Sequence, residues 1–367
     1  MQEKVQGKVQ GNPATDTAAR ALPEPTCGLC GAAGHLLYTG LEDRLFGAAG
    51  TWDLRQCPGC RLAWLDPKPL AEDVEKLYGD YYTHDEAVPD SLFRRAVLRG
   101  IPAALYGYGP RVEDPLERLC GRLLAALGPL REVAEHGIMW LPASLRGNLL
   151  DIGCGGGRFL DHMRGLGWEV WGSEADPRGA EQARSLLGGD RIYGDLLADD
   201  RLPRDFFDAV TLSHVVEHLF DPLATLRTCL GLLKPGGRLV VATPNLASLG
   251  HARFGEHWLH LDPPRHLQLF ETSNLRELAE RAGFEVQELR TPASTAHFLW
   301  QASTLMARQG SLPRIDLSGA NLALKLRSIF FWAREYARTR SGHACGEELL
   351  LVAHRPAESK GASGEVA

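Results

Sequence analysis

The stretch Asn148-Leu-Leu-Asp-Ile-Gly-Cys-Gly-Gly-Gly-Arg158 decides the fold of this chain. An apolar run that ends in Asp151 and breaks into glycines predicts a β-strand followed by a turn. Because glycine has no Cβ, the bare backbone of such a turn can approach a ligand closely. Glu174 ends the next apolar run, at the place where alternating α/β folds hold a ribose by its hydroxyl groups. Together these features predict a nucleoside-containing cofactor.

The glycine spacing separates one class of cofactor from another. Dinucleotide-binding turns require the pattern G-x-G-x-x-G, but Arg158 occupies the third glycine position and the glycine lies one residue earlier, at Gly157. The pattern D-x-G-x-G-x-G from Asp151 to Gly157 resembles motif I of the class I S-adenosylmethionine-dependent methyltransferases.

The segments that follow extend this resemblance. A short strand at 191–193 precedes Gly194-Asp195, and apolar runs at 207–213 and 238–245 read as buried strands. In this order they are similar to the ubiquinone-methyltransferase-like branch of the family over roughly residues 148–291. The resemblance implies a Rossmann-like α/β fold with a seven-stranded sheet in the order 3-2-1-4-5-7-6, whose seventh strand is antiparallel.

The resemblance also implies S-adenosyl-L-methionine as the cofactor. The Asp151 turn would hold its methionine end, Glu174 its ribose hydroxyls, and the residues after Gly194 its adenine. Solvated loop acids are the alternative interpretation of Glu174 and Asp195. The cofactor-binding residues that we predict are Asp151, Gly153, Cys154, Gly155, Gly157, Glu174, Ala175, Asp195, Leu196, Ser213 and His214.

Four of the eight cysteines form two pairs, Cys27-Gly-Leu-Cys30 and Cys57-Pro-Gly-Cys60, separated by 26 residues. Two such pairs facing each other supply four thiolates, the ligand set of a closed tetrahedral zinc site. Gly28 and Gly59 would permit the tight turns, and a long loop or additional strands must fill the interval. We therefore predict a structural zinc ion bound by Cys27, Cys30, Cys57 and Cys60.

Disulfide bonds or a redox pair are the alternatives to zinc. The absence of a secretory signal argues against disulfides, and one redox pair would not explain the second Cys-x-x-Cys. The sequence of residues 61–82 also resembles the zinc-binding N-terminal region of many bacterial methyltransferases of sugar and natural-product pathways. The remaining cysteines have no metal-binding spacing and are predicted to be small buried apolar residues: Cys120, Cys154, Cys229 and Cys345.

Length and composition are those of an ordinary globular protein. The 367 residues are 44% hydrophobic and 23% charged, and the net charge of −6 gives no indication of a polyanionic partner. No uncharged apolar run reaches about 18 residues and no apolar signal core stands at the start, so we expect a cytoplasmic location. We expect a disordered N-terminus (1–22), a zinc ribbon (23–82), a helical linker (83–147), a methyltransferase domain (148–356, with a helical insert at 292–345) and a disordered tail (357–367).

Helices are expected in the linker and in the insert. Asp114-Pro115 begins a helix with leucines recurring on one side. We expect it, with an earlier helix near 91–105, to join the ribbon to the catalytic unit and to cover part of the cofactor cleft. The insert contains helical stretches near 294–309 and 320–338, and the second is basic and amphipathic. Such a helix can lie at a membrane surface, but the sequence favours a lid packed on the domain or a dimer face.

Two segments carry candidate catalytic groups. His214-Val-Val-Glu-His218 matches the H-x-x-E-H pattern of a zinc-peptidase family, but Pro222 leaves no room for a long ligand-bearing helix. We therefore do not predict a metal there and keep His218 as a catalytic candidate. The segment after the fifth strand resembles a D-x-P-R-H-L motif of the family, and a histidine there could accept a proton from a hydroxyl group. It contains His257, His260, Asp262, Arg265 and His266.

The catalytic candidates in that segment are His260 and His266, and the alternative is that Arg265 and His266 only fasten the loop to the domain. The leading functional hypothesis is methyl transfer to a small hydroxylated acceptor, such as a sugar, a glycan precursor or a natural product. An rRNA or tRNA methyltransferase is the second hypothesis, against which the acidic charge and the absence of a basic, aromatic stripe argue. A non-catalytic cofactor-binding scaffold is the third. The sequence does not determine the oligomeric state, a homodimer being one option.

Overall fold

The computed structural model describes residues 19–77, 91–194 and 201–357. Its central layer is a seven-stranded sheet in the order β12-β13-β10-β9-β6-β7-β8. Read from β8, with β6 as the first strand, this is the predicted order 3-2-1-4-5-7-6. The strands are β6 (Asn148–Ile152), β7 (Glu169–Ser173), β8 (Ile192–Tyr193), β9 (Phe207–Ser213), β10 (Leu233–Pro244), β12 (Glu285–Arg290) and β13 (Glu348–His354).

Strand β13 is the exception to the parallel arrangement. It pairs antiparallel with β10, with Val241 opposite Leu351, and antiparallel with β12 on its other side. The remaining neighbours in the sheet pair parallel. Parallel strands place their carboxyl ends at one edge of the sheet, so Asp151 and Glu174 meet there.

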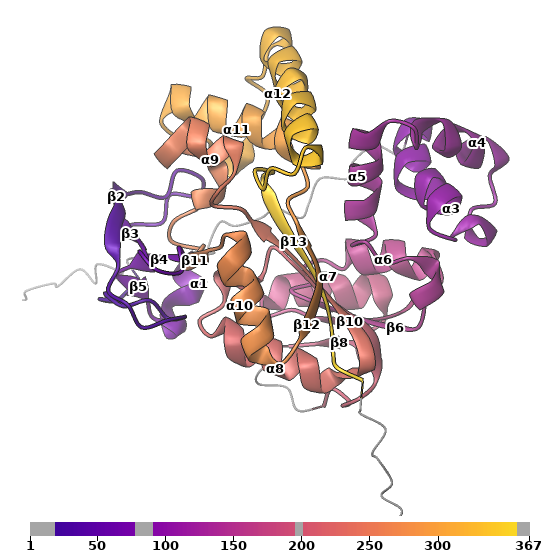
Figure 1. Ribbon diagram of the computed structural model, residues 1–367, viewed down its shortest axis with the longest axis horizontal. Coiled ribbons are helices and arrows are strands. Elements are labelled where there is room, and N and C mark those ends of the chain that lie inside the picture. Colours follow the sequence, from indigo (N-terminus) through magenta and orange to yellow (C-terminus); the bar gives the residue numbers. More distant parts are fainter. Residues whose placement is uncertain (1–18, 78–90, 195–200, 358–367) are drawn as a thin grey trace, which may run out of the picture.

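Apolar side chains fill both faces of this sheet because successive residues of a strand point in opposite directions. Leu149 packs with residues of α6 and α7 on one face, whereas Leu150 packs with residues of α8 and α10 on the other. Figure 1 shows the helices on the two sides of the sheet. They are α6 (Arg158–Gly165), α7 (Pro177–Leu187), α8 (Pro222–Leu232) and α10 (Thr272–Ala282).

The N-terminal ribbon shares a sheet with the catalytic part of the chain. Strands β2 (His35–Leu41), β3 (Trp52–Gln56) and β4 (Ala63–Asp66) form an antiparallel sheet, and β11 (Gln268–Leu269) adds to its edge beside β4. The additional strands expected between the cysteine pairs are therefore present. A short helix, α1 (Val74–Leu77), follows the ribbon.

The predicted disorder of residues 1–22 is wrong at its end. Strand β1 (Ala21–Leu22) pairs with β5 (Lys68–Pro69), and Arg20 forms an ion pair with Asp73 at 2.8 Å. These long-range contacts order a segment whose local sequence has no periodic apolar pattern. Residues 1–18 and 358–367 lie outside the described part of the chain.

The linker forms a helical unit beside α6, which Figure 1 shows in purple. Within this unit, the helix that contains Gly121 packs backbone to backbone against the turn that ends at Gly100. A Cβ added to Gly121 would lie only 2.1 Å from the carbonyl carbon of Gly100. The predicted cap is present, with Asp114 accepting from the backbone of Leu116 and Glu117. The unit contains α2 (Leu92–Arg95), a π-helical turn (Ala96–Gly100), α3 (Ile101–Leu105), α4 (Pro115–Leu124) and α5 (Gly128–Gly137).

The helices predicted in the insert are α11 (Ala296–Gln309) and α12 (Leu322–Arg340), and they lie at the top of Figure 1 together with α9 (Leu249–Phe254). Phe331 of α12 is buried and packs against Trp300 of α11, with ring centroids 4.2 Å apart. In the described ranges, every helix is too short or too polar to cross a bilayer.

Candidate functional site

The glycine turn follows β6 and opens into α6. Gly153, Gly155 and Gly157 have φ values of 69°, 53° and 81°, in the left-handed region that favours glycine. A Cβ at Gly153 would lie 2.5 Å from the side chain of Val215. The turn therefore needs glycine for its conformation and, at Gly153, for the approach of the segment after β9.

Glu174 stands directly after β7 and its carboxylate reaches back to the turn. It accepts hydrogen bonds from the backbone N–H of Gly155 at 2.7 Å and of Asp176 at 2.8 Å. The side chain is half-buried and lies at the carboxyl edge of the sheet. The glycine turn and Glu174, which the sequence predicted to bind one cofactor, are therefore in direct contact.

Asp151 is the last but one residue of β6 and is buried beside β9. It accepts a hydrogen bond from Thr211 at 2.6 Å. Burial, together with the negative charge of Glu174, raises the pKa of Asp151 to about 7, against the opposing effect of the Thr211 bond. A cation placed at this edge would favour the ionised carboxylate, so the site suits a positively charged ligand.

The other predicted cofactor residues divide into two groups. Cys154 is buried in the turn, Ala175 is exposed after Glu174, and Ser213 is half-buried at the end of β9. Asp195 and Leu196 lie outside the described residues, so their predicted place beside the adenine stays a prediction.

Replacing Glu174 by alanine is expected to weaken binding of the cofactor by about one to two powers of ten. A hydrogen bond to a charged group contributes roughly 1.5–3 kcal/mol. Titration calorimetry with S-adenosylhomocysteine measures the change, and Glu181→Ala, at an exposed acid on α7, is the matched control. Unchanged affinity in a folded Glu174→Ala protein would remove this residue from the site.

A group of histidines and glutamates begins directly after β9. His214 Nε2 lies 2.8 Å from Glu348 Oε1, and His214 Nδ1 lies 3.3 Å from Glu217 Oε1. Burial alone would lower the pKa of His214, but the two carboxylates outweigh it and raise this pKa to about 10. The same contacts lower the pKa of Glu217 and of Glu348 to about 2. His214 is therefore a cation held between two anions at neutral pH.

The three predicted catalytic histidines adjoin this ion group. The His260 ring lies 5.4 Å from that of His214, and the His266 ring lies 4.7 Å from that of His218. Burial lowers the pKa of His260 to about 3 and the pKa values of His266 and His218 to about 4, and the positive charge of His214 adds to the effect on His260 and His266. All three are therefore neutral, weakly basic imidazoles near pH 7.

The three histidines differ in how their ring nitrogens are used. His266 Nδ1 lies 2.7 Å from the carbonyl oxygen of His260, and His218 Nδ1 lies 3.0 Å from that of Arg265. His260 Nδ1 is buried and has no hydrogen-bond partner among the described residues. His260 is therefore the strongest candidate for proton transfer, and His266 and His218 are held by backbone.

The H-x-x-E-H segment does not form a peptidase helix. It begins at the end of β9 and makes a single 3₁₀ turn at Val216–His218 before α8 begins at Pro222. Ligand atoms of Glu217, His218 and His266 lie within 4.8 Å of one another. Glu217 already accepts from Thr243 at 2.8 Å, and protein contacts account for this geometry.

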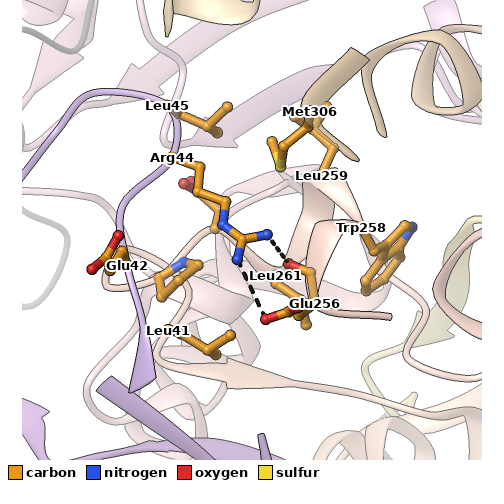
Figure 2. A pocket seen from close by; sticks show the side chains of 11 residues that line it. Leu41, Glu42, Arg44, Leu45, Glu256, Trp258, Leu259, Leu261 and Met306 are labelled. Atoms are coloured by element: carbon orange, nitrogen blue, oxygen red, sulfur yellow. Dashed lines mark hydrogen bonds and ion pairs between the residues drawn. The ribbon is translucent and has the colours of Figure 1, made fainter. Parts of the chain in front are cut away.

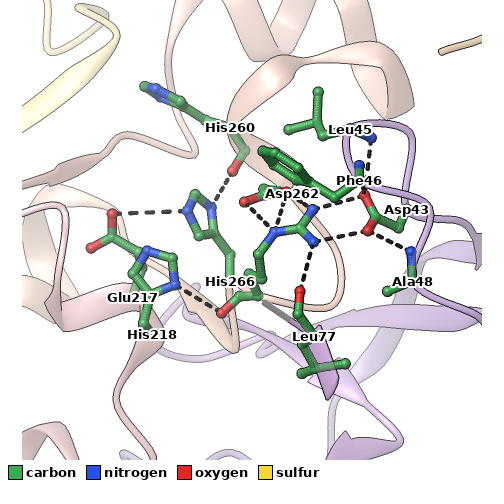
Figure 3. A network of polar contacts seen from close by, with 11 residues as sticks. Asp43, Leu45, Phe46, Ala48, Leu77, Glu217, His218, His260, Asp262 and His266 are labelled. Atoms are coloured by element: carbon green, nitrogen blue, oxygen red, sulfur yellow. Dashed lines mark hydrogen bonds and ion pairs between the residues drawn. The ribbon is translucent and has the colours of Figure 1, made fainter. Parts of the chain in front are cut away.

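Arg265 has a structural role, as the alternative interpretation predicted, but it fastens its segment to the ribbon and not only to the domain. Its side chain is fully buried and donates to both carboxylate oxygens of Asp43, at 2.7 and 2.8 Å, and to Asp262. It also donates to the carbonyl of Leu77 at 3.3 Å, and the ring of Phe46 lies 4.6 Å from its guanidinium. Figure 3 shows that this network adjoins His260 and His266.

Replacing Arg265 by methionine is expected to destabilise the protein by about 3–5 kcal/mol. The substitution leaves the carboxylates of Asp43 and Asp262 buried without their cation. Urea unfolding measures the change. The control is Arg44→Met, which breaks the more exposed pair with Glu256 and should cost about 0–1 kcal/mol. Equal losses in both variants would contradict the assigned role.

A small pocket lies between the segment after β10 and the loop that follows β2, here called the ribbon loop (residues 42–45). Figure 2 shows Arg44 donating to the carbonyl and carboxylate oxygens of Glu256, with Trp258 and Leu261 lining the same space. Its volume of about 10 Å³ is that of roughly one water molecule. A pocket of this size is too small for an acceptor molecule.

The four ribbon cysteines converge as predicted. Their Sγ atoms all lie within 4.8 Å of one another, with Cys27–Cys60 at 3.5 Å and Cys30–Cys57 at 3.4 Å. Zinc–sulfur bonds of about 2.3 Å in a tetrahedron place sulfurs about 3.8 Å apart, so the thiols fit zinc.

The turns around the four thiols differ in detail from the prediction. The left-handed residues are Gly31 and Arg61, at equivalent places in the two knuckles, whereas Gly28 and Gly59 have no positive φ. Of the other cysteines, Cys154, Cys229 and Cys345 are buried and Cys120 is only half-buried.

Comparison with known proteins identifies the family. A methyltransferase domain family matches residues 115–289. The ubiquinone biosynthesis O-methyltransferase of Thiobacillus denitrificans is 31% identical over 176 residues, which cover 44% of this chain and 75% of that protein. The chain belongs to the class I S-adenosylmethionine-dependent methyltransferases.

For other relatives of this methyltransferase, the matched region is a smaller share of the relative's length. The ubiquinone biosynthesis O-methyltransferase of Cereibacter sphaeroides (strain ATCC 17025) is 42% identical over 117 residues, 30% of this chain and 47% of that protein. The chain thus spans about half the length of the first curated relatives it matches. A solved S-adenosylmethionine-dependent methyltransferase from Mesorhizobium loti is 18% identical with a TM-score of 0.40, over 61% of this chain and 98% of that one.

Several polar residues of this methyltransferase site escaped the sequence analysis. Glu348 and His136 approach each other at 3.7 Å, and Asp43 and Thr211 hold Arg265 and Asp151. Glu348 opens an otherwise apolar strand, and a carboxylate that is buried there needs a partner to offset its desolvation.

Proposed function

We propose that this chain transfers the methyl group of S-adenosyl-L-methionine to a hydroxyl oxygen of a small acceptor. The observation that carries the proposal is the direct joining of the glycine turn to the histidine–glutamate group: Val215, which packs over Gly153, follows His214 in the chain. A cofactor-binding turn and a set of proton acceptors thus lie at one edge of the sheet. Membership of the methyltransferase family supports the same conclusion.

The residues of the glycine turn fit the cofactor. Its sulfonium and amino groups are cations, which Asp151 at the turn would stabilise, and Glu174 would accept hydrogen bonds from its ribose hydroxyls. When bound, the cofactor supplies an already activated methyl group. Positioning of the acceptor can therefore account for most of the rate.

The protein residues would deal with the proton of the acceptor hydroxyl. His260 is neutral near pH 7 and its Nδ1 lacks a described partner. Because its lowered pKa makes it a weak base, it would accept the proton only as the oxygen gains the methyl group and becomes strongly acidic. His214, held as a cation by Glu217 and Glu348, would keep its positive charge beside His260 throughout the reaction. Burial of the group by Trp258 and the ribbon loop would limit access of water.

The oxygen acceptor is favoured by the names of the relatives, which are O-methyltransferases. Within hydroxylated acceptors, we propose a sugar, a glycan precursor or a natural product, with quinone-type phenols as the competing class. Incubation of the protein with methyl-labelled cofactor and a panel of phenols, nucleotide sugars, lipid-linked glycans and RNA, followed by mass spectrometry, tests this. Label in RNA, or in none of the panel while the cofactor binds, would contradict the proposal.

We further propose that the ribbon holds one structural zinc ion through Cys27, Cys30, Cys57 and Cys60. The support is the convergence of four reduced thiols at spacings close to those of a tetrahedral site. Such a site has no open position, so its role is to hold the ribbon and, through it, the segment that carries His260. A cytoplasmic location stays a prediction of the sequence.

A further inference from the structure

We propose that the outer face of α12, together with α4, binds the surface of a lipid bilayer that contains anionic lipid. The starting observation is the distribution of exposed apolar side chains. Ten of the fourteen large exposed apolar residues in the described part of the chain lie in the helical linker or on α12. Exposed apolar residues gathered in this way mark an interaction surface.

Helix α12 has two distinct faces. The exposed face carries Leu322, Leu326, Ile329 and Phe330, which are 53–72% exposed and follow the spacing of one side of a helix. The buried face is formed by the residues that pack on the domain, and at about 100° per residue it lies directly opposite. One side of α12 thus packs on the domain, as one of the alternatives from the sequence predicted, through Leu324, Ser328, Phe331 and Glu335.

The charges of α12 lie on the flanks of its apolar face. Lys325 lies on one flank, and Arg327 and Arg334 lie on the other; all three are exposed. The one acidic residue of the helix, Glu335, is buried and accepts from the backbone N–H of Glu347 at 2.9 Å. Long basic side chains beside an apolar stripe can reach anionic headgroups while the stripe enters the acyl boundary.

Helix α4 offers a second surface of the same chemistry. Leu116, Leu119 and Leu123 are 50–68% exposed along one side. Arg118 and Arg122, on the adjoining side, line a surface hollow of about 340 Å³ together with Ala103 and Ala104 of α3. The leucine pattern predicted from the sequence is thus correct, but these leucines face outward.

The two helices belong to one end of the molecule. Tyr336 of α12 packs on Gly128 at the start of α5, where an added Cβ would lie 1.8 Å from its hydroxyl oxygen. Figure 1 shows α12 at the top and α4 at the right of the view, with α5 between them and both away from α8 and α10. A chain with net charge −6 that exposes only basic charge on α12 has a local attraction for anionic surfaces.

A bilayer fits this surface better than a second copy of the chain. A pair of α12 helices would bring Lys325, Arg327 and Arg334 of both copies to one interface, where α12 offers no exposed acidic residue to pair with them. Like charges brought together in an interface are costly. Anionic headgroups would instead neutralise them.

Flotation of the full-length protein with vesicles tests the proposal. We expect binding to vesicles of equal parts phosphatidylcholine and phosphatidylglycerol, weaker binding at high salt, and little binding to phosphatidylcholine alone. Leu326→Glu combined with Phe330→Glu should weaken binding at least about tenfold, because two apolar side chains can no longer enter the lipid. Lys325→Glu combined with Arg327→Glu should weaken it by reversing the local charge.

The matched control is Leu36→Glu, at a leucine of β2 that is 47% exposed, which should bind like the wild type. Melting temperatures show that the variants are folded. Absence of binding to either vesicle, or equal binding by wild type and the α12 variants, would overturn the proposal. So would a wild-type dimer, measured by light scattering, that Phe330→Glu converts to a monomer.

Discussion

Replacing His260 by alanine is expected to lower kcat by about 10²–10⁴ and to leave the affinity for S-adenosylmethionine nearly unchanged. A positioned general base contributes a factor of this size, and the contacts of the glycine turn do not include His260. The measurement is steady-state turnover with the acceptor that the labelled panel identifies, alongside calorimetry for the cofactor.

The pH profile gives this prediction a second test. Because burial and the charge of His214 keep the pKa of His260 near 3, its base form is complete across pH 5–8. The wild-type kcat should therefore show no inflection near pH 6.5, where an exposed histidine would titrate. The ion group should persist over the same range, since the carboxylates of Glu217 and Glu348 ionise well below it and His214 loses its proton well above it.

The control for His260 is His35→Ala, at an exposed histidine on β2, which should keep kcat within about twofold of the wild type. A His260→Ala protein with full turnover would return this residue to a structural role. In that case His266→Ala becomes the decisive variant.

Replacing Cys57, one of the four proposed zinc ligands, by serine is expected to unfold the ribbon. Structural zinc contributes roughly 10–16 kcal/mol in small peptides, and the ribbon sheet has little core of its own. Because β11 pairs with β4 and Arg265 with Asp43, the loss should spread to the segment that carries His260. Elemental analysis of the purified protein and thermal unfolding measure the effect.

Cofactor binding should survive in the Cys57→Ser protein far better than turnover, because the glycine turn lies in the other sheet. Cys120→Ser, at a half-buried cysteine outside the cluster, is the matched control and should melt like the wild type. Wild-type protein that is fully folded and contains no zinc would contradict the metal assignment.

The sheet and its turn could be predicted because their signals are local. Asp151, the glycines and Glu174 lie within one strand–turn–helix–strand unit, and backbone sterics require glycine at the turn. The caps at Asp114, Asp176 and Asp221 are likewise local. The insert helices, placed from apolar periodicity, begin and end within a few residues of the prediction.

The histidine group could be predicted only as a list of residues. Their roles depend on partners far away in the chain: His214 meets Glu348 across 134 residues, and Arg265 meets Asp43 across 222. A pKa is set by burial and by neighbouring charge, and neither is visible in a segment read alone. The same limit explains the outward leucines of α4 and the ordered strand β1.

The amino-acid sequence by itself determined the class of fold, the cofactor turn and the four-cysteine cluster, since each rests on residues whose spacing enforces a local geometry. Only the tertiary structure decided that the ribbon shares a sheet with the catalytic segment, that His214 is charged while His260 is neutral, and that α12 presents apolar residues to solvent. The physical reason is that desolvation, ion pairing and exposure are properties of the packed chain, and distant residues set them.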